Sequence, residues 1–94
     1  MYIRLVQFNL GAGKRSVAES IADKVVPVIR AQPGIISCEF IMDEVTGDYG
    51  IVVRWKSKEA ADAAYPVLSP IVIPTITAAK GTPNIRLFEV YEPK

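Results

Sequence analysis

Histidine is absent from this chain of 94 residues, and Cys38 is its only cysteine. Without histidine the chain has no imidazole base, no Ser-His-Asp triad and no imidazole ligand for zinc, iron or haem. A single cysteine excludes an internal disulfide and a cysteine-cluster metal site, and its place in an apolar segment indicates a buried thiol. We therefore expect no metal ion and no other cofactor.

An excess of charge of one sign is also lacking, because eleven Lys and Arg residues balance ten Asp and Glu residues. Nothing in this balance attracts nucleic-acid phosphates or an anionic lipid surface, so we expect no nucleic-acid partner and no membrane partner. The first residues predict a strand and not a secretory signal, which favours a cytoplasmic protein. Half of the residues are hydrophobic, and the length fits a single domain over residues 1–94.

The hydrophobic pattern predicts the order of the secondary structure. Segments rich in β-branched and aromatic residues predict strands at residues 2–10, 35–42, 49–56 and about 85–91. Helices are predicted at residues 16 to about 30 and 58 to about 65. The order βαββαβ predicts an α+β, ferredoxin-like fold with a four-stranded antiparallel sheet and both helices on one face.

Capping residues mark where the two predicted helices begin. Ser57 can cap the second helix through its hydroxyl, directly after the strand that ends at Trp55. Ser16 stands three residues before Glu19, which predicts a capping box at the first helix. Pro27 should kink that helix or end it early.

The stretch from residue 63 to residue 79 contains no charge and has prolines at positions 66, 70 and 74. A membrane span needs about 20 apolar residues and few helix breakers, so this stretch is not predicted to be one. We expect the second helix to stop near Tyr65, and a short helix to run from Ser69-Pro70 to Gly81. Imperfect packing of the broken segment predicts an apolar cavity beside Trp55 and Tyr65.

The first strand presents apolar side chains on both of its faces. Ile3 and Leu5 lie on one face, and Val6 and Phe8 lie on the other. Two helices can cover only one face of a four-stranded sheet. We therefore expect a homodimer that buries the second face.

The short motifs add a resemblance to a known family. Pro33-Gly34 precedes the second predicted strand, and Trp55-Lys56-Ser57-Lys58-Glu59-Ala60 follows the third. Ser69-Pro70 and a final strand complete the pattern. Over nearly its whole length the chain resembles the antibiotic biosynthesis monooxygenase (ABM) domain family of the dimeric α+β barrel superfamily.

The resemblance implies a homodimer in which two ferredoxin-like sheets form an α/β barrel. Its better known members oxygenate electron-rich aromatic rings without metal or flavin. It therefore implies a cofactor-independent monooxygenase acting on a small aromatic or quinol-type substrate. The residues nearest to such a site are, as catalytic candidates, Asn9, Trp55 and Tyr65, and as ligand-binding candidates, Arg54, Ile71 and Ile76.

Each catalytic candidate has a structural alternative. Asn9 can equally be a turn residue, Trp55 a core residue at the junction of sheet and helix, and Tyr65 a packing residue at a helix end. The haem-degrading branch of the family needs a histidine where this chain has Tyr65 or Pro66. Haem degradation is therefore not expected.

Arginines within strands leave two interpretations open. Arg4, Arg54 and Arg86 could gather into a patch that binds a carboxylate or phenolate. Alternatively, they line an edge or pair with a carboxylate such as Glu39 or Glu89.

The sequence also contains two weaker patterns and is compatible with a second function. Asp43-Glu44 is either a solvated turn or part of a divalent-metal site. Gly47-Asp48-Tyr49-Gly50-Ile51-Val52 faintly resembles an RNA-binding strand but lacks its basic start and its paired aromatics. The alternative to an oxygenase is a non-catalytic dimeric module that binds a small ligand or a protein.

Overall fold

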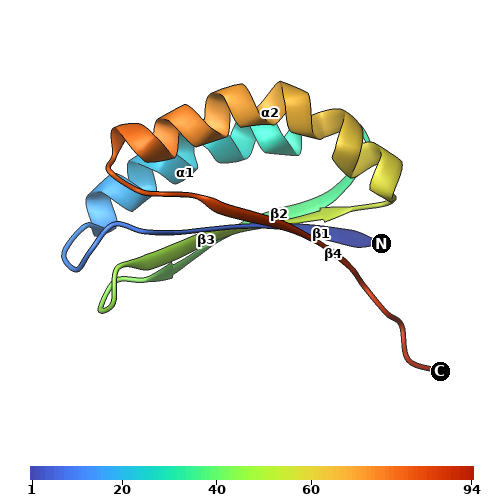
Figure 1. Cartoon of the computed structure of the whole chain (residues 1–94), viewed down its shortest axis with the longest axis horizontal. Helices are drawn as coiled ribbons and strands as arrows, with labels where there is room; N and C mark the ends of the chain where they lie inside the picture. The colour runs from blue at the N-terminus through green and yellow to red at the C-terminus, as the bar shows by residue number, and fades with distance from the viewer.

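A computed structural model describes the whole chain, Met1–Lys94, and has the predicted α+β, ferredoxin-like architecture. One antiparallel sheet has the strand order β2-β3-β1-β4, and both helices cover the same face of it (Figure 1). No helix is long and apolar enough to cross a membrane. The elements are β1 (Tyr2–Asn9), α1 (Arg15–Arg30), β2 (Ile35–Asp43), β3 (Asp48–Trp55), α2 (Lys58–Ala78) and β4 (Asn84–Glu89).

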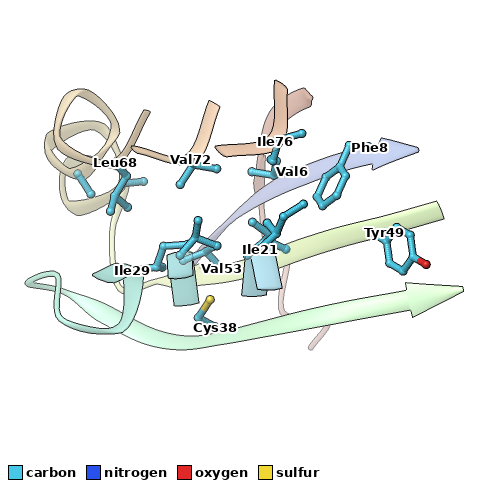
Figure 2. Packing of buried hydrophobic residues seen from close by; sticks show 14 of the residues in the cluster. Val6, Phe8, Ile21, Ile29, Cys38, Tyr49, Val53, Leu68, Val72 and Ile76 are labelled. Atoms are coloured by element: carbon cyan, nitrogen blue, oxygen red, sulfur yellow. The ribbon is translucent and has the colours of Figure 1, made fainter. Parts of the chain in front are cut away.

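The core lies between the helices and the covered face of the sheet. Val6 of β1 and Val53 of β3 point toward the helices because successive strand side chains alternate between faces. Figure 2 shows Leu68, Val72 and Ile76 from α2 above these strand residues. The stripe on α1 consists of Ala18, Ile21, Val25 and Ile29, all buried.

The structure confirms one of the two predicted helix caps and contradicts the other. The prediction for Ser57 is confirmed, because its Oγ accepts a hydrogen bond from the backbone N–H of Ala60 at 3.1 Å. The capping box at Ser16 is wrong, because α1 begins at Arg15 and Lys14 occupies the N-cap position without a side-chain cap. Ser16 already lies inside the helix, where its hydroxyl cannot reach the free N–H groups of the first turn.

The predicted interruption of the second helix is also wrong, since α2 runs without a break from Lys58 to Ala78. Pro66, Pro70 and Pro74 recur every fourth residue and are all exposed, so they share the solvent side of the helix. The carbonyls that lose a partner there can bond to water, and the helix arches over the sheet with its convex side outward (Figure 1). Pro27 is likewise exposed, and α1 continues past it to Arg30.

The turn after β2 brings two glycines into backbone contact. Gly47 has a φ of 81°, and its carbonyl accepts a hydrogen bond from the N–H of Leu10 at 2.9 Å. A Cβ atom on Gly47 would overlap the carbonyl group of Gly11. Gly13 has a similar φ of 76° with nothing within 4 Å of such an atom. Substitution of Gly13 therefore tests backbone strain alone, whereas substitution of Gly47 tests strain together with steric overlap.

We expect Gly13→Ala to lower the free energy of unfolding by roughly 1–2 kcal/mol, the cost of a left-handed non-glycine residue. Gly47→Ala should cost roughly 1–3 kcal/mol more, because backbone must also move to relieve the overlap. Urea denaturation followed by circular dichroism measures both. Equal losses for the two variants would mean that the approach of Gly47 to Gly11 is not tight in solution.

Candidate functional site

An apolar cavity lies between α2 and the covered face of the sheet, beside the end of β3. Ten of its twelve lining residues are hydrophobic. The two others are Arg4 from β1 and Ser69 from α2. Trp55 and Tyr65 both line it, so the cavity lies where the sequence predicted one, although α2 above it is a regular helix.

Trp55 forms the wall at the end of β3, where the chain turns through Ser57 into α2. Its side chain is 2% exposed, and its indole Nε1–H has no hydrogen-bond partner. An unpaired buried donor costs roughly 1–3 kcal/mol. A water molecule or a ligand acceptor within reach of this N–H would remove the cost.

Arg4 is the only charged residue that lines the cavity. It lies on the helix-facing side of β1, in the same alternation as Val6, and its side chain is 17% exposed. Its Cζ lies 4.8 Å from the centre of the Tyr65 ring, a cation–π contact. The Tyr65 side chain is 40% exposed, so this pair lies between the cavity and solvent.

Asp62 holds Arg4 only loosely. The carboxylate of Asp62 is 4.0 Å from the Arg4 guanidinium, beyond hydrogen-bonding distance. The same carboxylate accepts a hydrogen bond from Lys58 Nζ at 2.9 Å, and this bond raises the pKa of Lys58. The Arg4 guanidinium therefore has no hydrogen-bonded carboxylate partner and remains available to a ligand.

The polar groups around the cavity are mainly donors. The Arg4 guanidinium and the Trp55 indole can only donate, and the hydroxyls of Ser69 and Tyr65 can donate or accept. No carboxylate and no other general base lines the cavity. The arrangement can orient an oxygen acceptor but cannot remove a proton by itself.

The cavity is small in this conformation. The space open to the centre of a water-sized sphere is about 40 Å³, room for a few water molecules. Cavities that hold drug-sized ligands measure roughly 300–1,000 Å³. An aromatic ring can enter only if a wall moves, and Tyr65 is the one exposed residue of the wall.

Asn9 lies at the other end of the sheet from this cavity. It pairs with Asp48 at the start of β3, whereas Trp55 pairs with Tyr2 at the end, roughly 23 Å away. The Asn9 side chain donates to Thr46 O at 3.2 Å and accepts from the Gly11 N–H at 2.8 Å. These hydrogen bonds fit the structural alternative, in which Asn9 is a turn residue.

The other expected ligand-binding residues also lie apart from the cavity. Arg54 points to the opposite face of the sheet, where it pairs with Glu39 and donates to Ser37 Oγ at 3.4 Å. Ile76 is buried in the core, and Ile71 is half-buried on α2, but neither lines the cavity. The residues that line it instead include Leu68, Ser69 and Val72. Their spacing of one and two turns from Tyr65 would have indicated them had the helix been predicted as continuous.

The three strand arginines do not gather into one patch. Arg4 lies on the helix face, whereas Arg54 and Arg86 lie on the open face, where Arg86 stacks on Phe88. The alternation of side chains along β1 could have predicted the position of Arg4, because Arg4 and buried Val6 are two residues apart and therefore lie on the same face of the sheet.

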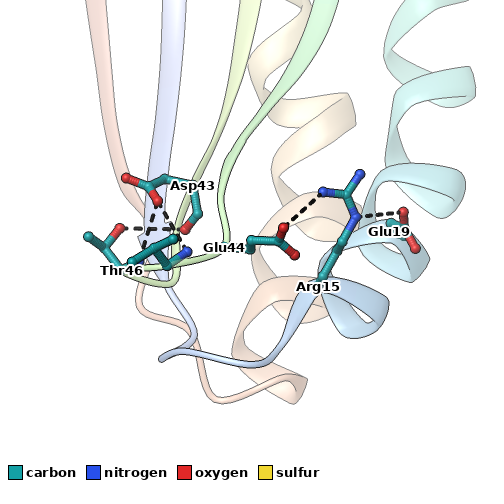
Figure 3. A network of polar contacts seen from close by, with 6 residues as sticks. Arg15, Glu19, Asp43, Glu44 and Thr46 are labelled. Atoms are coloured by element: carbon teal, nitrogen blue, oxygen red, sulfur yellow. Dashed lines mark hydrogen bonds and ion pairs between the residues drawn. The ribbon is translucent and has the colours of Figure 1, made fainter.

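Asp43 and Glu44 form a solvated turn with an ion pair (Figure 3). Asp43 Oδ1 accepts from the Val45 N–H at 3.2 Å, and Arg15 lies between Glu44 and Glu19 at 3.7 and 3.2 Å. No group of three or more Cys, Asp or Glu side chains is placed to hold a metal ion.

Solved structures match the chain over its whole length. A Deinococcus radiodurans protein, provisionally named an antibiotic biosynthesis monooxygenase, is 17% identical with a TM-score of 0.78, covering 100% of this chain and 96% of that one. The cofactor-independent oxygenase SnoaB from Streptomyces nogalater is 20% identical with a TM-score of 0.73, covering 98% and 94%. The chain has the fold of these oxygenases.

A third match contains a ligand. The monooxygenase ActVA-Orf6 from Streptomyces coelicolor, in complex with nanaomycin D, is 16% identical with a TM-score of 0.72, covering 99% of this chain and 89% of that one. Neither a scan against protein-family models nor a search of curated proteins finds a match. At identities this low the structural likeness shows the fold, which the sequence motifs had predicted, and not the reaction.

Cys38 is no candidate nucleophile. It is buried in β2, and burial raises the pKa of its thiol to about 11, with a smaller opposing effect of Arg30. The Arg30 guanidinium bonds to the Cys38 carbonyl at 2.9 Å, not to the thiol. The thiolate, the reactive form, is therefore scarce at neutral pH.

The raised pKa predicts a loss of stability at alkaline pH. The unfolded chain releases the Cys38 proton near pH 9 and the folded chain near pH 11, so stability is full below pH 9 and falls as the pH rises toward 11. We expect a loss of up to about 3 kcal/mol across this window, measured by urea denaturation. Cys38→Ala should lack this component, and an identical alkaline slope in the two proteins would contradict the prediction.

Proposed function

We propose that the chain is a cofactor-independent monooxygenase acting on a small aromatic or quinol-type substrate in the cavity beside Trp55 and Tyr65. The observation behind the proposal is the unpaired indole N–H of Trp55 at an apolar cavity whose other fixed donor is Arg4. These groups can orient the oxygen of a phenol or quinol while apolar walls contact its ring. The shared fold with SnoaB and ActVA-Orf6 supports the same reaction class.

Such a reaction needs no separate reductant. A phenol and O₂ give a quinone and water, so one oxygen atom enters the ring and the other leaves as water. All four electrons that O₂ accepts come from the substrate. The chain's task is to bind the electron-rich form of the substrate, orient it and keep bulk water away.

In this proposal the Tyr65 side chain covers the entrance to the cavity. The resting cavity is too small for a ring, and Tyr65 is its exposed wall residue, held by one cation–π contact with Arg4. Such contacts contribute about 0.5–1 kcal/mol at partly exposed sites, so a bound ring can replace the contact at little cost.

The second candidate function is a non-catalytic module that binds a small ligand. The absence of a carboxylate or other base around the cavity favours it, because most acid–base reactions need such a group. Both candidates require ligand binding beside Trp55, so turnover is what separates them.

The test uses air-saturated solutions of small phenols and quinols with the purified chain. We expect O₂ uptake and one labelled oxygen atom in the product when isotopically labelled O₂ is supplied. Trp55→Phe should lower kcat/KM by roughly tenfold or more, because the donor is lost while the ring is kept. Val67→Ala, on the exposed side of the same helix, should leave it unchanged.

Compounds that quench Trp55 fluorescence yet are recovered unchanged would contradict the oxygenase and favour the binding module. Rates that are equal in Trp55→Phe and the unaltered chain would also contradict the proposed site.

We further propose that the chain forms a homodimer through the open face of its sheet. Ile3, Leu5 and Val52 are only half-buried there, and Ile41 and Phe88 are exposed. A soluble protein seldom leaves a contiguous apolar sheet face uncovered. The C-terminal tail leaves the domain on the side of this face (Figure 1), where a second copy would lie.

Charges on the open face favour one orientation of the two copies. The strand register places Glu39 of β2 and Arg86 of β4 in one row across the sheet, with Val52 and Leu5 between them. A two-fold axis parallel to the strands would bring Glu39 of each copy opposite Arg86 of the other. An axis perpendicular to the strands would instead bring like charges together.

Charge reversal tests this orientation. Glu39→Arg and Arg86→Glu should each raise the dimer dissociation constant roughly tenfold or more, because each variant opposes like charges. The double variant should recover part of the lost affinity, since the pair across the interface is exchanged while the pair of Glu39 with Arg54 in its own chain is lost. Lys24→Glu on exposed α1 makes the same change in net charge as Arg86→Glu and should have no effect.

Analytical ultracentrifugation over a range of concentrations measures these constants. A single chain at all concentrations would overturn the dimer, and a double variant no better than the singles would overturn the proposed axis.

A further inference from the structure

We infer that Arg4 makes the cavity selective for aromatic ligands that present an anionic oxygen, a phenolate or a carboxylate, over their neutral counterparts. The inference rests on the proposed function, since it concerns the same cavity. It goes beyond it by assigning the charge of the ligand and the residue that selects it.

The position of Arg4 is unusual for a charged residue. It occupies a core-facing site on the central strand β1, between Val53 on β3 and Leu87 on β4. Burying a guanidinium here costs free energy unless a partner compensates it. The structure supplies only a ring contact with Tyr65 and a carboxylate 4.0 Å away.

The two groups that hold Arg4 are both replaceable. Asp62 already bonds to Lys58 at 2.9 Å, so it loses little if Arg4 turns away. Tyr65 must itself move for a ring to enter the small cavity. A ligand that displaces the Tyr65 ring therefore frees the guanidinium at the moment when it can bind the ligand's oxygen.

The hydrogen-bond donors around the cavity exclude a preference for cationic ligands. Arg4 and Trp55 can only donate hydrogen bonds, so a ligand must present acceptors to both. A phenolate or carboxylate oxygen accepts several hydrogen bonds and gains a charge-assisted bond to the guanidinium. An ammonium group would meet a positive charge without any carboxylate among the lining residues.

This selectivity would also explain how the cavity works without a base. Arg4 favours the ionised form of a bound phenol and so lowers the pKa of the ligand. The phenolate is the electron-rich form that reacts with O₂, and its proton leaves to solvent before or during binding. No residue of the chain has to accept it.

The probe is p-nitrophenol, whose ionisation is visible in its absorbance, and the neutral comparison is p-nitroanisole, which has no acidic proton. Quenching of Trp55, the only tryptophan, measures binding of each. We expect p-nitrophenol to bind more tightly as the pH rises through its pKa, and p-nitroanisole to bind weakly at every pH. The absorbance of the bound probe should show a lowered pKa.

Variants assign the effect to Arg4. Arg4→Met keeps the length of the side chain without its charge and should weaken phenolate binding roughly 10- to 100-fold, leaving p-nitroanisole unchanged. Arg4→Lys keeps the charge and should retain part of the preference, which separates charge from packing. Arg15→Met, at the start of α1 where Arg15 makes exposed ion pairs with Glu19 and Glu44, removes an equal charge elsewhere and should have no effect.

Equal binding of the phenolate to Arg4→Met and the unaltered chain would overturn the inference, as would no binding of either probe. A phenolate preference that depends on Arg4 but comes with no O₂ uptake would support the inference while contradicting the oxygenase. The two proposals can therefore fail separately.

Discussion

The packing of one stripe of α2 on the sheet is the contact on which the rest of this structure depends. Ala61, Ala64, Leu68, Val72 and Ile76 are all buried along it. A fully buried Leu or Ile stabilises the fold by roughly 1.5–3 kcal/mol, which helps to hold helical a segment that contains three prolines. The prolines are tolerated because their spacing keeps every lost hydrogen bond on the solvent side. The cavity lies beneath this continuous helix, which supplies Ala61, Ala64, Leu68 and Val72 to its lining.

The same helix gives the candidate site its composition. Two small residues, Ala61 and Ala64, leave space above Trp55, and Tyr65 and Ser69 lie one turn apart at the same wall. Arg4 enters from the sheet below as the single charge. An apolar space with fixed donors and no carboxylate suits an electron-rich aromatic with an oxygen to bind. It suits poorly any reaction that depends on a base supplied by the protein.

The two faces of the sheet carry different kinds of side chains. The covered face holds the cavity, and the open face combines apolar side chains with Glu39, Arg54 and Arg86. Burying such charges between two copies costs desolvation energy that only good pairing offsets. Their arrangement in rows would then fix the orientation of the copies more than it would strengthen the dimer. Strand alternation is the common cause, since it assigns Arg4 to one face and Arg54 to the other.

The sequence by itself determined the order of the elements, the cap at Ser57 and the pairing of a buried stripe on α1 with the sheet, because these follow from local patterns of period 2 and 3.6. It also placed Trp55 and Tyr65 near each other, through the strand–cap–helix junction between them. Only the tertiary structure decided that α2 continues through Pro66, Pro70 and Pro74, since whether a proline breaks a helix depends on which side faces solvent. Alternation along the strands already implied that Arg4 and Arg54 lie on opposite faces of the sheet. Only the tertiary structure placed Arg4 beside Tyr65 in the cavity and Asn9 at the far end of the sheet, because these distances depend on strand register and on how α2 packs, which no local pattern specifies.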